Sequence, residues 1–172
     1  MAEATLSGAT HPILENDYAS EWMGIEVVAL DDGHATIRMA LRQEMLNGFG
    51  MAHGGMIFAF GDTAFALACN QSTPSPADEG NITVASGVDI NFLKPAFRGQ
   101  VLTAVANRRA MTGRSGLYDV QIFAADPAVS TSDAGPAGPA PAATVPGQLP
   151  TDVPPGELIA EFRGRSRTIS KK

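Results

Sequence analysis

The chain has 172 residues, 44% of them hydrophobic and 17% charged, which fits one compact domain with a buried core. A net charge of −6 argues against a nucleic-acid-binding protein, because such a protein would carry a basic excess. With one cysteine, no secretory signal and no apolar run longer than 56–69, the chain is expected to be cytoplasmic and to have no membrane partner.

The hydrophobic pattern predicts two helices and six strands. A short helix is expected across 12–23. A long helix is expected across 56–70, where the chain has no proline and Gly61 is the one interior glycine. The strands are expected at 25–30, 35–41, 84–93, 101–108, 117–124 and 157–169. In the third strand, alternation places five side chains on one face, namely Val84, Ser86, Val88, Ile90 and Phe92.

Two segments are set apart from this pattern. Residues 1–10 are expected to be disordered, and residues 11–172 are expected to form a single domain with a flexible insertion at 126–156. The insertion holds eight of the twelve prolines, six alanines and no lysine or arginine. With so little bulky apolar content it cannot offset its ordering entropy, so it is predicted to be a loose arm between two hairpin strands.

The long helix carries one carboxylate in apolar surroundings. Its residues are apolar on nearly every side, which indicates a helix buried all round. Asp62 lies in the middle, with no lysine or arginine on the same helix. A lone buried carboxylate is costly unless it is paired from elsewhere, neutralised or placed in a cleft. Asp62 is therefore interpreted either as a structural hydrogen-bonding group or as a nucleophile or general base.

The start of this helix favours the catalytic interpretation. Gly54 and Gly55 leave bare backbone at the first turn, where unpaired N–H groups and the positive end of the helix dipole face outward. Such a terminus suits a developing oxyanion, although a plain tight turn would also use two glycines. Asn47, just upstream, is expected either to orient a substrate or water or to form an ordinary Asn-Gly turn.

The spacing along the helix predicts a site shared between subunits. Asp62 follows Gly54 by eight residues, which is roughly 12 Å along a helix. A reacting carbonyl has to lie about 3 Å from both the attacking group and the oxyanion donor. One subunit therefore cannot readily supply both groups, whereas two helices lying antiparallel across a two-fold axis can. We expect a homodimer with two equivalent sites.

Several motifs carry a family resemblance. The central ones are LNG at 46–48, HGG at 53–55 and GDTAFALACN at 61–70. Agreement continues through INFLKP at 90–95, GLYDV at 116–120 and FRGRS at 162–166. Together these motifs, spread over roughly 12–125 and 157–169, resemble the hotdog-fold thioesterases of the phenylacetate-degradation (PaaI) type.

The resemblance implies an α+β hotdog fold, in which an antiparallel sheet of about six strands wraps around one long central helix. It implies hydrolysis of acyl-coenzyme A, with phenylacetyl-CoA and ring-hydroxylated relatives as leading substrates, in homodimers or dimers of dimers. Asp62 would be the nucleophile or base. The Gly54 and Gly55 amides would polarise the thioester carbonyl, and Asn47 would help to position substrate or water. No cofactor is implied beyond the coenzyme A of the substrate.

The resemblance also leaves departures and alternatives. Relatives have a short turn in place of the insertion. Ala85 stands roughly where some hotdog thioesterases have a hydroxyl, and whether Ser86 compensates is open. His53, a substrate-binding candidate, raises the alternative of a hotdog dehydratase with a histidine acid/base; otherwise it holds the loop. A non-catalytic acyl-CoA-binding module is the other alternative. The three scattered histidines and one cysteine lack metal-ligand spacing, so no metal site is predicted.

Basic residues concentrate in the second part of the chain, where ten of the twelve lysines and arginines fall from Lys94 onward. This imbalance either suits an anionic ligand, such as the phosphates of coenzyme A, or is an ordinary solvated surface. Arg114 is the first candidate because glycines flank its turn. The further candidates are Lys94, Arg98, Arg163 and Arg165.

Overall fold

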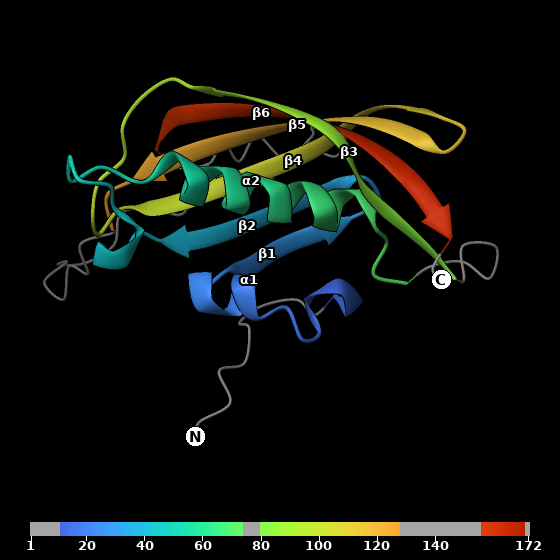
Figure 1. Ribbon diagram of the computed structural model, residues 1–172, viewed down its shortest axis with the longest axis horizontal. Helices are drawn as coiled ribbons and strands as arrows, with labels where there is room; N and C mark the ends of the chain where they lie inside the picture. The colour runs from blue at the N-terminus through green and yellow to red at the C-terminus, as the bar shows by residue number, and fades with distance from the viewer. Residues whose placement is uncertain (1–10, 74–79, 128–155, 171–172) are drawn as a thin grey trace, which may run out of the picture.

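The computed structural model describes residues 11–73, 80–127 and 156–170, and it has two layers (Figure 1). Six strands form one antiparallel sheet in the order β1-β2-β4-β5-β6-β3, and the long helix α2 (Gly54–Cys69) lies across one face. The strands are β1 (Glu26–Asp31), β2 (His34–Ala40), β3 (Asn81–Phe92), β4 (Val101–Thr112), β5 (Ser115–Ala125) and β6 (Glu157–Ser170). The predicted α+β hotdog architecture is confirmed.

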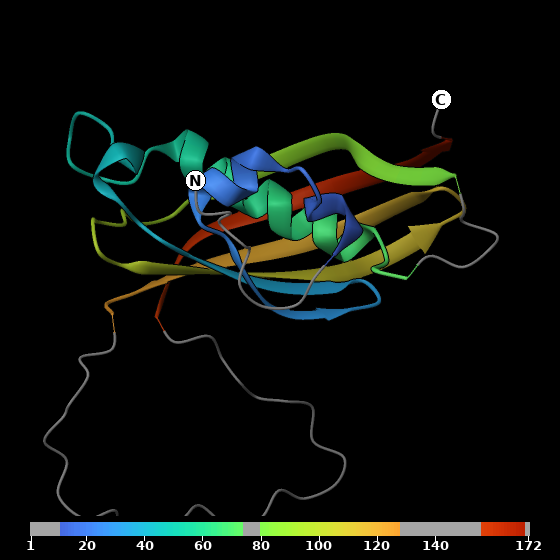
Figure 2. The same ribbon diagram turned by 90° about the horizontal axis from the view of Figure 1, so that it is seen from below.

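Helix α2 packs closely on the sheet because small residues leave room for large ones across the interface. Gly61 faces β5 and β6, where a Cβ would come within 3.2 Å of the Ile122 and Phe162 side chains. On β6, a Cβ at Gly164 would come within 2.7 Å of the Phe65 ring. These glycines therefore allow the core to reach the density of a protein interior. In Figure 2 the strands follow one another from β3 to β1 behind α2.

Asn70 fixes the C-terminal end of α2 to the edge strand β3. Its side chain accepts a hydrogen bond from the Thr83 N–H (2.9 Å) and donates to the Thr83 carbonyl (3.0 Å) and the Ala66 carbonyl (2.9 Å). The buried His11 ring accepts the Ile13 N–H at Nδ1, so its Nε2 carries the proton that it donates to the Asn70 carbonyl (2.9 Å). This network sets the direction in which α2 crosses the sheet.

The helix boundaries differ from the prediction in two places. The helix expected across 12–23 is divided into a 3-10 turn, Pro12–Leu14, and α1, Tyr18–Met23. Asn16 lies between them with φ 64°, a left-handed conformation that an α-helix cannot contain. The long helix begins at Gly54, two residues before the expected start, because glycine's low helix propensity conceals a helix start from the sequence pattern.

A bulge in β3 overturns the predicted face of its first half. Val88 pairs with Gly164 on the face that contacts α2, as the alternation indicates. The register shifts between Ala85 and Gly87, and Val84 therefore pairs with Arg167 on the opposite face. Because a side-chain period of two reverses with one extra residue, the hydrophobic pattern alone could not locate this bulge.

Part of the predicted organisation lies outside the described residues, namely the N-terminal segment 1–10 and residues 128–155 of the insertion. The two strands that flank the insertion are neighbours in the sheet, since Ala124 of β5 pairs with Glu157 of β6. In the described ranges, no helix combines the length and the hydropathy needed to cross a membrane.

Candidate active site

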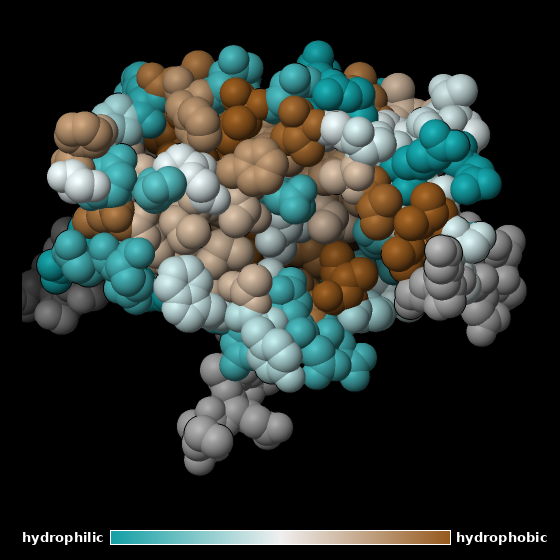
Figure 3. Space-filling view, in the orientation of Figure 1, coloured by the Kyte–Doolittle hydropathy of each residue, from teal (hydrophilic) through white to brown (hydrophobic). Residues whose placement is uncertain are grey.

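Helix α2 is exposed along one stripe, so the all-round burial expected from its sequence is wrong for the single chain. Ile57 and Phe60 are buried against the sheet, whereas Phe58 is 38% exposed and Asp62 is half-buried. The space-filling view shows apolar side chains gathered on this face, over α2 and the strands beside it (Figure 3). Part of the apolar surface of α2 is therefore exposed to solvent in the single chain.

The Asp62 carboxylate lies in this stripe and has no hydrogen-bond or ion-pair partner among the described residues. Burial disfavours its charged form and raises the pKa of Asp62 above the ordinary value of 3.8. A carboxylate with a raised pKa is a stronger base than an exposed aspartate. It is therefore suited to take a proton from water or to attack a carbonyl carbon, as the sequence analysis expected.

The first turn of α2 presents one free backbone amide. His53 is the N-cap residue, and its Nδ1 accepts a hydrogen bond from the Gly55 N–H at 3.0 Å. The next two amides, those of Met56 and Ile57, donate to the His53 carbonyl. Within the described part of the chain, the Gly54 N–H has no acceptor, so it is the donor left for an oxyanion. The Gly54 and Gly55 amides, which were both expected to polarise the carbonyl, therefore differ. The Gly55 N–H is bonded to His53, and the Gly54 N–H is free among the described residues.

The hydrogen bond from Gly55 also determines the protonation of His53. A ring nitrogen that accepts an N–H carries no proton, so neutral His53 has its proton on Nε2. A Cβ at Gly55 would come within 3.2 Å of His53 Nδ1, which keeps this position small. The loop-holding interpretation of His53 is supported by these contacts.

Asn47 organises the loop before α2 through its side-chain oxygen. Asn47 Oδ1 accepts hydrogen bonds from the N–H groups of Phe49 (2.9 Å) and Met51 (3.3 Å). The Asn47 N–H donates to the Met51 carbonyl at 2.8 Å. The turn-forming role considered for Asn47 is therefore present, and its side-chain NH₂ group is the part left for a substrate or water.

The five basic residues considered for an anionic ligand do not form one cluster. Lys94 and Arg98 follow β3 in the chain, and Lys94, which lies near the start of α2, forms an ion pair with Glu157. Arg114 lies in the turn between β4 and β5, where its Nε donates to the Thr168 carbonyl at 3.0 Å. Within one chain these side chains therefore cannot share one phosphate group.

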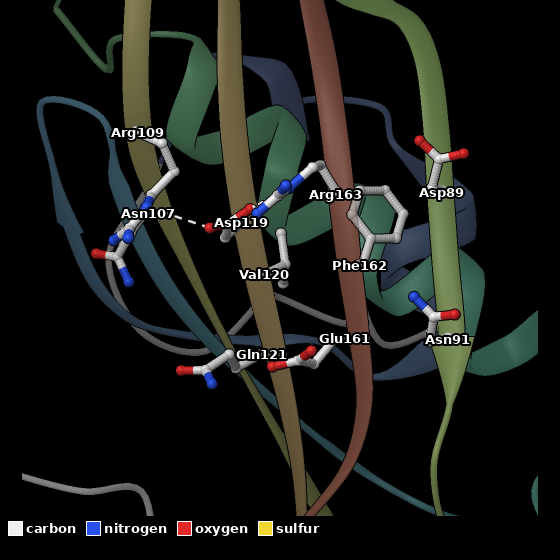
Figure 4. A pocket seen from close by; sticks show the side chains of 10 residues that line it. All are labelled: Asp89, Asn91, Asn107, Arg109, Asp119, Val120, Gln121, Glu161, Phe162 and Arg163. Atoms are coloured by element: carbon white, nitrogen blue, oxygen red, sulfur yellow. Dashed lines mark hydrogen bonds and ion pairs between the residues drawn. The ribbon is translucent and has the colours of Figure 1, made fainter.

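The other two basic candidates lie on the face of the sheet opposite α2. Arg163 and Arg165 alternate along β6 with buried residues, and α2 lies behind the strands in Figure 4. Arg163 Nε lies 2.7 Å from Asp119, which also pairs with Arg109 at 3.1 Å, and Arg165 pairs with Asp89 at 2.5 Å. A hollow of about 540 Å³ opens here. The sheet separates this hollow from the candidate catalytic groups on α2.

A smaller hollow, of about 350 Å³, opens beside Gly54. Phe92, the last residue of β3, forms part of its wall, because a Cβ at Gly54 would come within 3.3 Å of the Phe92 ring. Phe92 is 53% exposed. Phe92 was not among the site residues expected from the sequence. In the sequence, it was marked by its position on the apolar face of a predicted strand. That position does not distinguish an aromatic residue of the core from one that lines a pocket.

Two further nucleophilic side chains, those of Cys69 and Ser86, are not poised for catalysis. Burial raises the pKa of the Cys69 thiol to about 12, with a further contribution from the charge of Asp62, so the thiol is protonated at neutral pH. Ser86 lies in the β3 bulge and donates to the Arg165 carbonyl at 3.0 Å, so it does not replace a hydroxyl at Ala85. The described residues contain no group of three or more His, Cys, Asp or Glu that could hold a metal ion.

Comparisons with known proteins identify relatives of this chain. Residues 49–131 match the sequence model of the thioesterase superfamily. The chain is 40% identical over 112 residues to the acyl-coenzyme A thioesterase PaaI of Escherichia coli (strain K12), covering 65% of this chain and 75% of that one. It is 30% identical over 108 residues to a putative esterase of Archaeoglobus fulgidus, covering 63% of this chain and 66% of that one.

A solved structure of the E. coli PaaI protein, from the phenylacetic acid degradation operon, has the same fold. Its TM-score with this chain is 0.68, at 32% sequence identity, and the match covers 93% of this chain and 90% of that one. The two proteins therefore share the sheet and the central helix.

Proposed function

This chain belongs to the thioesterase superfamily, in its hotdog-fold PaaI type, and from that premise we propose that it hydrolyses aryl-acyl thioesters of coenzyme A. Phenylacetyl and hydroxyphenylacetyl groups are the proposed acyl groups, and the products are the free acid and coenzyme A. The observation that carries the proposal is the pairing, on one helix, of a half-buried carboxylate of raised pKa with a free amide at the N-terminus.

Each group on α2 has a distinct chemical task in this reaction. The Gly54 N–H donates to the carbonyl oxygen of the thioester and stabilises the negative charge that develops there in the transition state. As a general base, Asp62 takes a proton from the water that attacks the carbonyl carbon, and the thiolate of coenzyme A leaves. As a nucleophile, Asp62 attacks the carbonyl carbon itself, the thiolate leaves, and water then hydrolyses the resulting mixed anhydride to the free acid and the Asp62 carboxylate. Coenzyme A is part of the substrate, and no separate cofactor enters the reaction.

The proposed site is shared between two copies of the chain. Asp62 and Gly54 are separated by about 12 Å along α2, which is too far for both to touch one carbonyl. Strand β3 is at an open edge of the sheet, and the α2 face beside it is apolar and partly exposed. A two-fold homodimer with antiparallel α2 helices would bring Asp62 of one subunit to Gly54 of the other.

Two alternative functions differ from hydrolysis in what happens to the thioester. A hotdog dehydratase would use His53 as an acid/base and would eliminate water from a hydroxyacyl thioester without releasing coenzyme A. The capping bond from Gly55 to His53 Nδ1 occupies one of the two nitrogens that this role could use. A non-catalytic binding module would hold the thioester unchanged, and it gives no reason for a half-buried carboxylate without a partner among the described residues.

A thiol-release assay tests the proposal. Phenylacetyl-CoA, 4-hydroxyphenylacetyl-CoA and octanoyl-CoA are offered to the purified protein, and free coenzyme A is measured with a thiol reagent. We expect the aryl-acyl thioesters to be cleaved with the higher kcat/KM. Asp62→Asn should lower kcat by about 10²-fold or more while retaining substrate binding.

The matched control is Asp32→Asn, which removes an exposed carboxylate that pairs with Arg108 at 2.7 Å. It should leave kcat unchanged. Near-wild-type turnover in folded Asp62→Asn would contradict the assignment of Asp62. Elimination products without free coenzyme A would favour the dehydratase, and tight binding without any product would favour the binding module.

A further inference from the structure

The hollow beside Gly54 has an apolar wall that the proposed chemistry does not yet use. Its volume of about 350 Å³ lies within the usual range of small-molecule pockets. Three segments meet there, namely the loop before α2, the first turn of α2 and the end of β3. They contribute Met51, Ile57, Phe92, Leu93, Lys94 and Pro95. The one charged side chain among them, Lys94, is paired with Glu157, so the pocket offers an apolar lining with its charge compensated at the rim.

Phe92 lies closest to the reacting position. A Cβ at Gly54 would lie 3.3 Å from Phe92 Cζ and 3.7 Å from both Cε atoms, so the tip of the ring faces the Gly54 Cα. The Gly54 N–H is the free amide of this helix terminus. A carbonyl oxygen about 3 Å from that nitrogen therefore lies beside the ring. In that position, the acyl carbons next to the carbonyl group contact the Phe92 ring.

We propose that this hollow is the acyl-binding pocket and that Phe92 is the residue that limits the size of the acyl group. The inference rests on the proposed thioesterase function, because that function places the substrate carbonyl at Gly54. An uncharged aryl group can pack against the Phe92 ring, and edge-to-face contacts between aromatic rings favour such a pair. A long alkyl chain has to pass the ring, which blocks its path.

Exposure of Phe92 agrees with this role. Phe92, 53% exposed, and the adjacent Leu93, 50% exposed, both line the hollow, and adjoining exposed apolar side chains of this kind commonly mark a binding site. Phe97, on the loop that follows β3, is exposed to a similar extent at 49%, but it does not line the hollow. The two phenylalanines therefore form a matched pair, one at the proposed pocket and one outside it.

The test compares Phe92→Ala with the control Phe97→Ala on phenylacetyl-CoA, octanoyl-CoA and dodecanoyl-CoA. In Phe92→Ala we expect the ratio of kcat/KM for dodecanoyl-CoA to that for phenylacetyl-CoA to rise about tenfold or more, as is usual when the size of an apolar pocket changes. Phe97→Ala should leave this ratio unchanged. If Phe92→Ala does not fold, Phe92→Leu keeps an apolar side chain without the ring and should shift the ratio in the same direction.

Binding measurements separate a failure of this inference from a failure of the proposed function. Thioethers of coenzyme A that carry a 2-phenylethyl or a dodecyl group cannot be hydrolysed, and calorimetry gives their Kd with each variant. Phe92→Ala should weaken the phenylethyl compound relative to the dodecyl one. If the wild-type protein cleaves no thioester, the proposed function fails. The pocket assignment is overturned if the wild type cleaves thioesters but Phe92→Ala does not differ from Phe97→Ala in two ratios. These are the ratio of kcat/KM for dodecanoyl-CoA to that for phenylacetyl-CoA, and the ratio of the Kd values of the two thioethers.

Discussion

Asp62 and Gly54 lie on the same helix, eight residues and about 12 Å apart, and each presents a polar group without a hydrogen-bond partner in the described part of the chain. One group is a carboxylate of raised pKa, and the other is an N–H at the positive end of a helix dipole. The two groups are complementary in a thioester hydrolysis but cannot meet within one chain. Their separation therefore governs both the proposed chemistry and the proposed assembly.

The raised pKa of Asp62 predicts opposite effects of its charge on activity and on stability. The reaction needs the carboxylate, so kcat/KM should fall as the pH falls, with an apparent pKa above the ordinary 3.8. Burial makes the folded state hold this proton more tightly than the unfolded state does. Stability from Asp62 is therefore lost as the pH rises from 3.8 through the raised pKa, and the loss persists at neutral pH. Asp62→Asn should accordingly raise Tm at pH 7.

Thermal unfolding of the wild type and Asp62→Asn between pH 4 and pH 8 measures this effect, and the difference in Tm should shrink toward pH 4. Asp32→Asn is again the control, because the hydrogen bond from Arg108 lowers the pKa of Asp32. That pairing stabilises the folded state above the ordinary pKa and is lost on acidification, so Asp32→Asn should lower Tm slightly at pH 7. A lower Tm for Asp62→Asn at pH 7 would mean that the Asp62 carboxylate is held by favourable contacts in the assembled protein.

His53 is predicted to act by capping α2 and not by proton transfer. In His53→Ser, the short hydroxyl can still accept an N–H in the first turn, whereas His53→Ala removes the acceptor. We expect His53→Ala to lose about 1 kcal/mol of unfolding free energy and to lose more activity than His53→Ser. Denaturant unfolding and kcat measured on both variants check this. Equal, large losses of kcat in two stably folded variants would instead assign the imidazole to the chemistry.

The central helix and the positions of its candidate groups were predictable from sequence because they depend on local patterns. An apolar run of helical length, a lone Asp62 and two glycines at the start are all readable along the chain. The bulge at Ser86, the capping bond from Gly55 and the meeting of Phe92 with Gly54 are not. These features depend on register and on contacts between segments distant in sequence, which composition and periodicity do not encode.

The spatial arrangement of the basic residues was likewise not predictable from the sequence. Ten of twelve fall after residue 93, and this clustering in sequence was interpreted either as a site for an anionic ligand or as an ordinary solvated surface. In the structure, Arg163 and Arg165 face away from α2 because β6 alternates its side chains, and Arg114 lies in the turn between β4 and β5. Basic residues that are concentrated in one part of the sequence therefore do not lie together in the structure.

The insertion is predicted to be dispensable for hydrolysis. Its flanking strands are already neighbours, with Ala124 of β5 paired with Glu157 of β6, so a short turn can close this hairpin. Replacement of residues 127–155 by a short glycine-containing turn should leave kcat/KM largely unchanged and keep the same oligomeric state, measured by size-exclusion chromatography with light scattering. A large loss of turnover in a variant that assembles normally would show that the insertion binds substrate or covers the site.

The last prediction is that inactive variants restore activity when they are mixed. Asp62→Ala removes the carboxylate, and Gly54→Pro removes the amide donor at the first helical position, where proline is often accommodated. His53, with ψ 130°, already has the extended backbone that a following proline requires. A Cβ at residue 54 would lie 3.3 Å from the Phe92 ring, so a small movement of that exposed side chain makes room. Circular dichroism of the proline variant checks its fold before mixing.

In a mixed dimer, one site combines the intact Asp62 of one subunit with the intact Gly54 of the other, and the second site carries both defects. Random equal mixing makes about half of the dimers mixed, each with one working site of two, so about one quarter of wild-type activity should return. Thiol release by the unsorted mixture after subunit exchange gives this fraction, and heterodimers isolated through two different affinity tags should have about one half of the wild-type activity per dimer. If each site lay within one chain, every subunit would carry a defect, and mixing would restore nothing. Isolated heterodimers without hydrolysis would therefore refute the shared site while leaving the roles of Asp62 and Gly54 to their own tests.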